Sequence, residues 1–333
     1  MKFSIILPVK NGGEYVKECV QSILLQTYQE FDLHILENCS TDGTAEWLQT
    51  LEDDRIIIIP SERSLSIEEN WARILSIEKN EFMTIIGHDD LLDKNYLQVM
   101  NELIQQYPDA SLYQTHFRFI DAKGNFLKKC KPMDEKQTVA AFLHALFVDS
   151  IDTMGTGYMM HSKDYEFVGG IPSYPNLLFA DHALWIKLTD LHFKATASSE
   201  SFLYRLHENL SKRSDAPRYI NAFYSYMDFL VELKTKDQNV WMVIDNYIAN
   251  YIQYYCRSLS HRLLKTPVSK RNGMKVSDFI NKCIKYNDLL TDKTRLLPLK
   301  QFNIRFAKFI DDNFITRKLY LLFRRIYQKP IYS

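Results

Sequence analysis

The chain has 333 residues, 46% of them hydrophobic, so it suits about two domains and is too apolar to be disordered as a whole. Its formal net charge is zero, but residues 251–333 hold 18 Lys and Arg against 5 Asp and Glu. The five cysteines are far apart and match no zinc or disulfide framework. The first residues do not resemble a secretory signal, and no stretch approaches the roughly 18 apolar residues of a membrane span. We therefore expect a cytoplasmic protein with reduced thiols.

Strand-like and helix-like patterns alternate through the first hundred residues. Apolar, β-branched runs indicate buried strands, and apolar residues three or four positions apart indicate the helices between them. Such alternation is typical of βαβ units around a mostly parallel sheet. The expected strands are 3–9, 31–36, 55–59, 82–86, 111–120 and one that ends near 161, and the expected helices are 15–24, 67–78 and 137–148.

Beyond Pro217 every segment has helical periodicity. The clearest case is the recurrence of Ile244, Ile248 and Ile252 with tyrosines at helical spacing, which predicts an amphipathic helix. We therefore place a domain boundary near residue 215.

The tetrapeptide Gly87-His88-Asp89-Asp90 directly follows the expected strand 82–86. Two adjacent carboxylates at the end of a buried strand are costly unless a positive group lies nearby. In α/β sheets, ligands bind at the carboxyl ends of the strands. A divalent cation with a phosphate-bearing substrate would satisfy both conditions, because hard cations take oxygen ligands and substrate phosphates complete their coordination. The pair is therefore a candidate metal and nucleotide site.

Two further loops should reach the same edge of the sheet, 8–11 and 37–44, because parallel strands present their carboxyl ends on one side. No Gly-x-Gly-x-x-Gly opens the first helix, and no Gly-Lys-Ser/Thr follows a glycine-rich loop. These absences disfavour a dinucleotide cofactor and a P-loop. A nucleotide at this edge would need a metal and side chains to hold its phosphates.

The segments Ile6-Leu7-Pro8-Val9-Lys10-Asn11 and Glu37-Asn38-Cys39-Ser40-Thr41-Asp42-Gly43-Thr44 resemble the N-terminal signature of glycosyltransferase family 2. The resemblance continues at 69–73, 87–90, 179–185 and 204–211, so it covers about residues 3–211. Members of this family are inverting enzymes of the GT-A fold, with a Rossmann-like mixed sheet, that use nucleotide-sugar donors. The resemblance implies a GT-A catalytic domain at 1–215, with a nucleotide-binding half at 1–110 and an acceptor half at 111–215. Residues 216–333 would form a helical C-terminal extension.

The resemblance also assigns binding roles residue by residue. Glu37 and Asn38 lie where the family usually has two aspartates that contact the base and ribose, and an amide can still donate and accept. Asp89 and Asp90 correspond to the family's Asp-x-Asp motif, whose first position is Gly87 here. We therefore expect Asp90 to be the chief metal ligand, with His207 as a second candidate. The expected nucleotide-sugar-binding residues are Pro8, Val9, Asn11, Glu37, Asn38, Arg63, Asn70, Asp89 and Arg205.

Asp181 corresponds to the family's catalytic base. The preceding residue is often acidic in the family but is Ala180 here, so Asp181 is the only carboxylate of its motif. Sugar transfer needs such a group, because the acceptor hydroxyl must lose a proton as it attacks. Mg²⁺ or Mn²⁺ would stabilise the negative charge on the departing nucleoside diphosphate. Without the resemblance, Asp181 would be interpreted as an ordinary surface residue of a helix.

Basic and apolar residues are interleaved along 300–329, with 8 Lys and Arg against 2 Asp and Glu. One interpretation is an interfacial helix on anionic lipid, where each basic residue near the surface contributes about 1 kcal/mol. The alternative is a helix that packs on the catalytic domain or on another subunit. Nucleic acid is disfavoured as a partner, because no binding motif accompanies the basic run.

The sequence thus predicts a bacterial hexosyl- or N-acetylhexosaminyl-transferase. It would move a sugar from a UDP-sugar to a hydroxyl of a surface glycan, such as capsule, lipopolysaccharide or exopolysaccharide, or of a lipid-linked glycan at the inner face of the membrane. A sugar nucleotidyltransferase also pairs carboxylates with Mg²⁺, although 11–13 lacks the arginine and further glycines of its N-terminal loop. Gly87, the pair Glu37-Asn38, and Ala180 also leave open a nucleotide- or glycan-binding protein that has lost catalysis.

Overall fold

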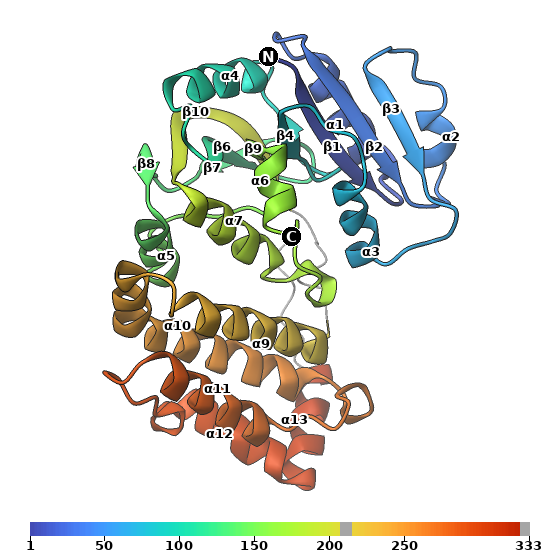
Figure 1. Cartoon of the computed structure of the whole chain (residues 1–333). Coiled ribbons are helices and arrows are strands. Elements are labelled where there is room, and N and C mark those ends of the chain that lie inside the picture. Colours follow the sequence, from blue (N-terminus) through green and yellow to red (C-terminus); the bar gives the residue numbers. More distant parts are fainter. Residues whose placement is uncertain (207–214, 327–333) are drawn as a thin grey trace. The chain divides into compact units, whose positions relative to one another are not determined.

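The first strand, β1 (Phe3–Val9), is buried at every position and lies inside the N-terminal sheet (Figure 1). It pairs in parallel with β2 (Phe31–Glu37) on one side and with β4 (Phe82–Ile85) on the other. β3 (Ile56–Pro60) continues the parallel part beyond β2. These strands confirm the predicted ones to within about one residue. The computed structural model describes residues 1–206 and 215–326.

The other half of the sheet is mixed. β9 (Tyr158–His161) runs antiparallel between β4 and β6 (Leu112–Ile120), and β10 (Lys194–Arg205) runs parallel to β6. The carboxyl ends of β1, β2, β4, β6 and β10 therefore point to one edge of the sheet. The sheet order is β3-β2-β1-β4-β9-β6-β10-β5, with β5 (Leu91–Leu92) at the end, β7 (Phe126–Lys129) beside β6 and β8 (Lys136–Gln137) beside β10.

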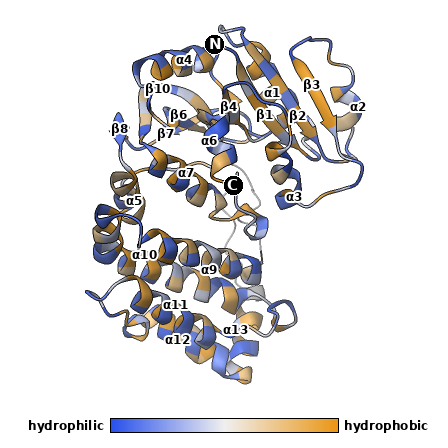
Figure 2. Cartoon of the chain, viewed as in Figure 1, coloured by the Kyte–Doolittle hydropathy of each residue, from blue (hydrophilic) through white to orange (hydrophobic). Residues whose placement is uncertain are grey.

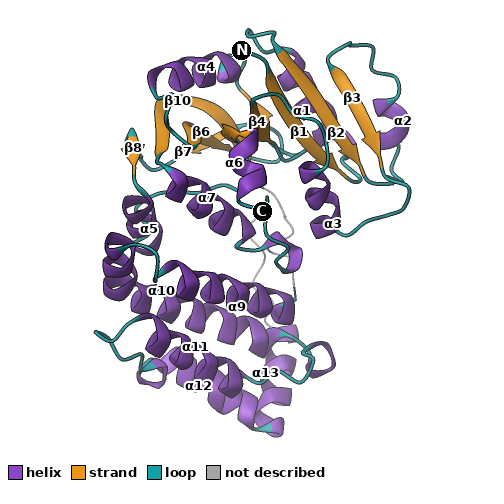
Figure 3. Ribbon diagram, in the orientation of Figure 1, coloured by secondary structure: helices purple, strands orange, loops and turns teal. Residues whose placement is uncertain are grey.

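Helices of this part connect the strands, as Figure 3 shows. The predicted helix 67–78 is shorter than expected, because it ends at Ala72 and a 3₁₀ turn, Arg73–Leu75, follows. The chain must leave the helix here so that Asn80 can bind Ser4 at the start of β1, where the Asn80 N–H lies 2.9 Å from Ser4 Oγ. The helices are α1 (Gly13–Leu24), α2 (Thr44–Leu48), α3 (Ile67–Ala72), α4 (Tyr96–Gln106), α5 (Val139–Phe147), α6 (Ser162–Phe167) and α7 (Ala180–Leu191).

Internal contacts divide the chain into two units, Met1–Lys212 and Arg213–Ser333. The described part of the second unit is helical, and its long helix α10 packs against α9, α11 and α12. Ile244, Ile248 and Ile252 are buried on α10, which confirms the predicted amphipathic helix. None of the helices within the described residues is long and apolar enough to cross a membrane. The helices are α9 (Ala216–Leu233), α10 (Gln238–Lys265), α11 (Val276–Leu290), α12 (Phe302–Asp312) and α13 (Phe314–Ile326).

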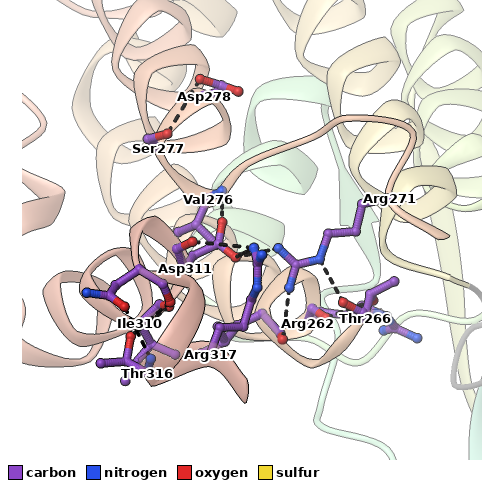
Figure 4. A network of polar contacts seen from close by, with 12 residues as sticks. Arg262, Thr266, Arg271, Val276, Ser277, Asp278, Ile310, Asp311, Thr316 and Arg317 are labelled. Atoms are coloured by element: carbon purple, nitrogen blue, oxygen red, sulfur yellow. Dashed lines mark hydrogen bonds and ion pairs between the residues drawn. The ribbon is translucent and has the colours of Figure 1, made fainter. Parts of the chain in front are cut away.

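A buried ion pair between Arg271 and Asp311 ties these helices together (Figure 4). The Arg271 guanidinium also donates to Leu264 O and Thr266 O at the C-terminal end of α10. Asp311 accepts from the N–H of Val276, the first residue of α11, and lies 3.4 Å from Arg317 of α13. Although burial acts in the opposite direction, these donors lower the pKa of Asp311. One carboxylate thus links four helical segments.

Lys194 of β10 is a second buried charge, on the sheet of the first unit. Its Nζ donates to Gln114 Oε1 at 2.8 Å and lies 5.3 Å from the centre of the Phe142 ring. Burial lowers the pKa of Lys194 to about 7, although Asp134 and Cys130 act in the opposite direction. An unfolded lysine has a pKa of about 10.4. Between these values the unfolded chain binds more protons than the folded one, so the free energy of unfolding should rise with pH.

We predict that Lys194→Met abolishes this rise. Between pH 7 and 9.5, Lys194 should contribute a slope of at most about 1.4 kcal/mol per pH unit in the wild-type chain. Urea unfolding followed by circular dichroism at several pH values measures the slope. Lys163→Met is the control, because the Lys163 side chain is exposed. An unchanged slope in Lys194→Met would show that the lysine is solvated in the folded protein.

Candidate active site

The three loops predicted to converge do contact one another at the carboxyl ends of β1, β2 and β4. The Asn11 N–H donates to Ser40 Oγ at 2.9 Å, and Asn11 Oδ1 accepts from the Thr41 N–H at 2.8 Å. A Cβ atom at Gly12 would lie 3.4 Å from His88 Cδ2. The loops 8–13, 37–44 and 87–90 therefore form one surface, on which Asn11 is exposed.

The side chains of Glu37 and Asn38 are buried and bind backbone groups. Glu37 accepts from the N–H groups of Cys39 and Ser40, at 3.0 and 2.6 Å. Asn38 Nδ2 donates to Leu65 O at 3.0 Å, while Oδ1 accepts from the Leu65 N–H at 2.7 Å. The amide thus uses both of its functions on one residue, which an aspartate could not do. In this conformation Glu37 holds the start of the loop 37–44, and Asn38 holds the loop 61–66 beside the site.

The two adjacent aspartates differ in their surroundings. Asp90 is buried; its Oδ1 accepts from the Arg205 N–H at 2.9 Å and its Oδ2 from Thr156 Oγ1 at 3.0 Å. Burial and the charge of Asp89 raise the pKa of Asp90. Asp89 is half-buried, so its carboxylate is closer to solvent than that of Asp90. In this structure donors of the protein occupy both oxygens of Asp90, and its expected role as the chief metal ligand stays a prediction.

Arg205, at the end of β10, has a fully buried side chain. Its guanidinium donates to Asp89 O at 2.7 Å and to Ala122 O at 3.1 Å, and it forms an ion pair with Glu18 at 2.5 Å. The expected direct contact of Arg205 with a nucleotide sugar would require this side chain to leave its partners. Its observed contacts instead hold the backbone of the 87–90 loop.

Asp181 lies in the first turn of α7, half-buried, beside the loop 153–157. A Cβ atom at Gly155 would be 3.7 Å from Asp181 Oδ2, and the next residue, Thr156, is the one that binds Asp90. The indole N–H of Trp185 donates to Met154 O at 3.1 Å and fastens α7 to the same loop. The structure thus brings Asp181 and the 87–90 loop, which are far apart in the sequence, to adjacent residues of one short loop.

The remaining predicted residues occupy the periphery or the interior of this region. Pro8 and Val9 are buried in β1, and Val9 O accepts from the Asn38 N–H. Asn70 is buried and binds Leu36 O and Arg73, whereas Arg63 is exposed and forms an ion pair with Glu69. His207 lies outside the described residues. Asn11, Arg63, Asp89 and Asp181 are therefore the predicted side chains with access to solvent.

The geometry supports a bound metal ion less strongly than the sequence does. Among residues 1–206 and 215–326, no three His, Cys, Asp or Glu side chains are grouped so that they could hold one. Both oxygens of Asp90 accept hydrogen bonds from the protein, and Asp89 is the less buried of the two carboxylates. Mg²⁺ is often held by one or two carboxylates together with substrate phosphates. The carboxylates of this region therefore fit a metal ion only at a site that substrate phosphates complete.

Sequence reasoning missed three residues that organise the region. Glu18 on α1 neutralises Arg205, Thr156 binds Asp90, and Arg73 donates to Ile59 O, Pro60 O and Glu37 O at the ends of β2 and β3. Thr156 had a usable signal, because it stands between Gly155 and Gly157, and glycines in such segments often mark close backbone approach. A Cβ atom at Gly157 would lie 2.4 Å from the Phe202 ring.

The fold is that of the GT-A glycosyltransferases. S. aureus TarS, solved as residues 1–349 in complex with UDP-GlcNAc, superposes with a TM-score of 0.68 over 98% of this chain and 92% of that one, at 13% identity. Residues 4–163 match the family model "Glycosyl transferase family 2". This match agrees with the family resemblance that the sequence motifs indicated.

Curated relatives carry glycosyltransferase names. Glycosyltransferase GlyG of Streptococcus pneumoniae is 26% identical over 125 residues, which is 37% of this chain and 42% of GlyG. The putative teichuronic acid biosynthesis glycosyltransferase TuaG of Bacillus subtilis is 26% identical over 214 residues, 62% of this chain and 79% of TuaG. The match spans under half of GlyG and only 18% of S. pneumoniae GlyA.

We predict that Asn38→Asp destabilises the first unit by about 1–3 kcal/mol, the usual cost of a buried polar group left without its partner. The introduced carboxylate would face Leu65 O, which loses its donor. Urea unfolding measures the change. Asn95→Asp is the matched control, since Asn95 uses its oxygen to accept from Thr27 and an aspartate keeps that oxygen. Equal stabilities of the two variants would contradict the role assigned to the Asn38 amide.

Proposed function

We propose that the protein is an inverting glycosyltransferase that moves a sugar from a UDP-sugar to a hydroxyl of a surface-glycan acceptor. The main support is the position of Asp181, a half-buried carboxylate separated from the 87–90 loop by the loop 153–157. The likeness of the fold to TarS, crystallised with UDP-GlcNAc, supports a UDP-sugar donor, and the similarity to TuaG supports a cell-envelope glycan as acceptor. The first unit would be catalytic, with the donor on the 8–13, 37–44 and 87–90 loops.

In the proposed reaction, the carboxylate of Asp181 accepts the proton of the acceptor hydroxyl. That oxygen attacks the anomeric carbon from the face opposite the nucleotide, and the bond to the diphosphate breaks in the same step, which inverts the configuration. General-base assistance of this kind typically accelerates a reaction by about 10²–10⁴-fold. Asp90 and Arg205 act as positioning residues, because their contacts hold the loop that bears Asp89.

A divalent cation, Mn²⁺ or Mg²⁺, would be held by Asp89 together with the donor diphosphate, and when bound it would stabilise negative charge on the departing UDP. His207, which lies outside the described residues, remains a candidate second ligand. Arg63 and Asn11 are exposed near the same loops and could contact the nucleotide, with Asn11 already anchored to Ser40 and Thr41.

We predict that Asp181→Asn lowers transfer at least 100-fold, because an amide cannot take up the proton, while UDP affinity stays within about twofold. Donor consumption and calorimetric UDP binding measure the two effects. Asp190→Asn, on the same helix but nine residues further, is the control and should retain wild-type turnover. UDP binding without any turnover in the wild type would favour a nucleotide-binding protein that has lost catalysis.

A second pair of variants separates the roles of the two aspartates. We predict that Asp89→Asn removes the Mn²⁺-dependent part of the thermal shift caused by UDP, with little change in the melting temperature of the free protein. Asp90→Asn should instead lower that melting temperature, because its amide cannot replace the carboxylate toward both donors. If Asp90→Asn abolished the Mn²⁺ effect and left the free protein unchanged, Asp90 would be the metal ligand after all.

A further inference from the structure

The helix α12 has two apolar stripes that face in different directions. Ile304, Ala307 and Ile310 are buried against the other helices of the second unit. Phe302, Phe306 and Phe309 recur at i, i+4 and i+7, so they form one stripe, and they are 66%, 38% and 61% exposed. An exposed row of three phenylalanines is unusual for a surface that meets only water.

The next helix, α13, continues this exposed apolar surface. Ile315, Leu319 and Leu322 lie on one side of the helix and are 55–67% exposed. Thr316 and Arg317 hold α13 against α12, since Thr316 Oγ1 donates to Ile310 O and Arg317 lies beside Asp311 (Figure 4). The contacts that fix α13 thus leave its apolar side uncovered within the described residues. The hydropathy of both helices can be followed in Figure 2.

Basic residues surround the start of this surface. A cavity of about 390 Å³ next to α12 is lined by apolar residues together with Arg295, Lys300 and Arg305. Between 295 and 323 the chain has 6 Lys and Arg against 2 Asp and Glu. Both acidic residues are already paired, Asp311 with Arg271 and Asp312 with Lys308. The surface therefore presents exposed hydrocarbon and uncompensated positive charge side by side.

We propose that this surface of α12 and α13 docks on an anionic phospholipid membrane. The exposed stripes would enter the boundary between headgroups and acyl chains, and the cavity lined by Arg295, Lys300 and Arg305 would receive a lipid phosphate. This combination of an apolar stripe with basic flanks is the one that binds interfacially. The inference concerns the second unit and does not depend on the proposed transfer activity.

Charge and hydrophobicity together favour an anionic membrane over a second copy of the chain and over soluble phosphate. A second copy of the chain would bring the same basic residues face to face, and like charges at close range oppose association. A soluble phosphate could neutralise the basic cavity but would leave the exposed Phe and Leu side chains in water. An anionic bilayer satisfies both requirements, because its lipid phosphates attract the basic residues while its acyl chains take up the apolar side chains.

Co-sedimentation of the full chain with vesicles tests the proposal. We expect binding to vesicles of phosphatidylcholine with 30 mol% phosphatidylglycerol, at least tenfold weaker binding to phosphatidylcholine alone, and weakening by salt. Phe309→Ser/Leu319→Ser and Lys300→Glu/Arg305→Glu should each weaken binding at least tenfold. The matched control, Lys163→Glu/Phe167→Ser, changes an exposed Lys and Phe on α6 and should bind like the wild type. Far-ultraviolet circular dichroism verifies that each variant is folded.

Three results would overturn the proposal. The first is no binding of the wild-type chain to anionic vesicles. The second is sedimentation-velocity evidence of a dimer that the Phe309→Ser/Leu319→Ser variant abolishes, which would identify a second copy as the occupant. The third is that 1 mM inorganic phosphate abolishes vesicle binding of the wild type while the Phe309→Ser/Leu319→Ser variant binds vesicles like the wild type. That result would identify the surface as a site for free anions.

Discussion

The buried carboxylate of Asp90 is the contact on which the edge of the N-terminal sheet depends. Its two oxygens join the end of β10, through the Arg205 N–H, to the loop 153–157, through Thr156. The Arg205 side chain then returns to Asp89 O, so the three segments close on one another. Burial and the charge of Asp89 raise the pKa of Asp90, so the two donors only partly offset the cost of an ionised group there. The burial of this carboxylate costs stability, so we infer that the geometry it enforces at the edge of the sheet serves the site.

That geometry also explains why a glycine stands at 87, where the family motif usually has its first aspartate. A Cβ atom on this residue would lie 2.8 Å from Asp89 Oδ1 and 3.2 Å from Asp90 Oδ2. Any side chain at 87 would push the two carboxylates out of their positions or be pushed out itself. With glycine at 87 both carboxylates keep these positions, with Asp90 as the internal anchor and Asp89 nearer to solvent.

Periodicity and turn residues were enough to predict β1 to β4, the helical second unit and the meeting of the 8–11, 37–44 and 87–90 loops, because these follow from local pattern and from parallel pairing. The insertion of β9 between β4 and β6 could not be predicted, since strand order depends on contacts distant in sequence. The roles proposed for Asp89 and Asp90 could not be predicted either, because the sequence does not say in which direction each of two adjacent aspartate side chains points. Arg205 is expected from the sequence to contact the ligand, and its pairing with the distant Glu18 is a contact that only the structure shows.

In the second unit, too, the sequence predicts the helices but not which of their side chains are buried. The pattern of 300–329 predicted amphipathic helices, but a sequence cannot say which of two apolar stripes on α12 is covered. The buried stripe consists of the smaller residues Ile304, Ala307 and Ile310, whereas the exposed one consists of phenylalanines. Full burial of a phenylalanine contributes about 1.5–3 kcal/mol, so a fold shaped for its own stability alone would have turned the larger stripe inward. The ion pair of Asp311 with Arg271 and the contact of Asp311 with Arg317 instead hold α12 and α13 so that the phenylalanines face outward. We infer that the fold maintains these exposed phenylalanines at a cost in stability.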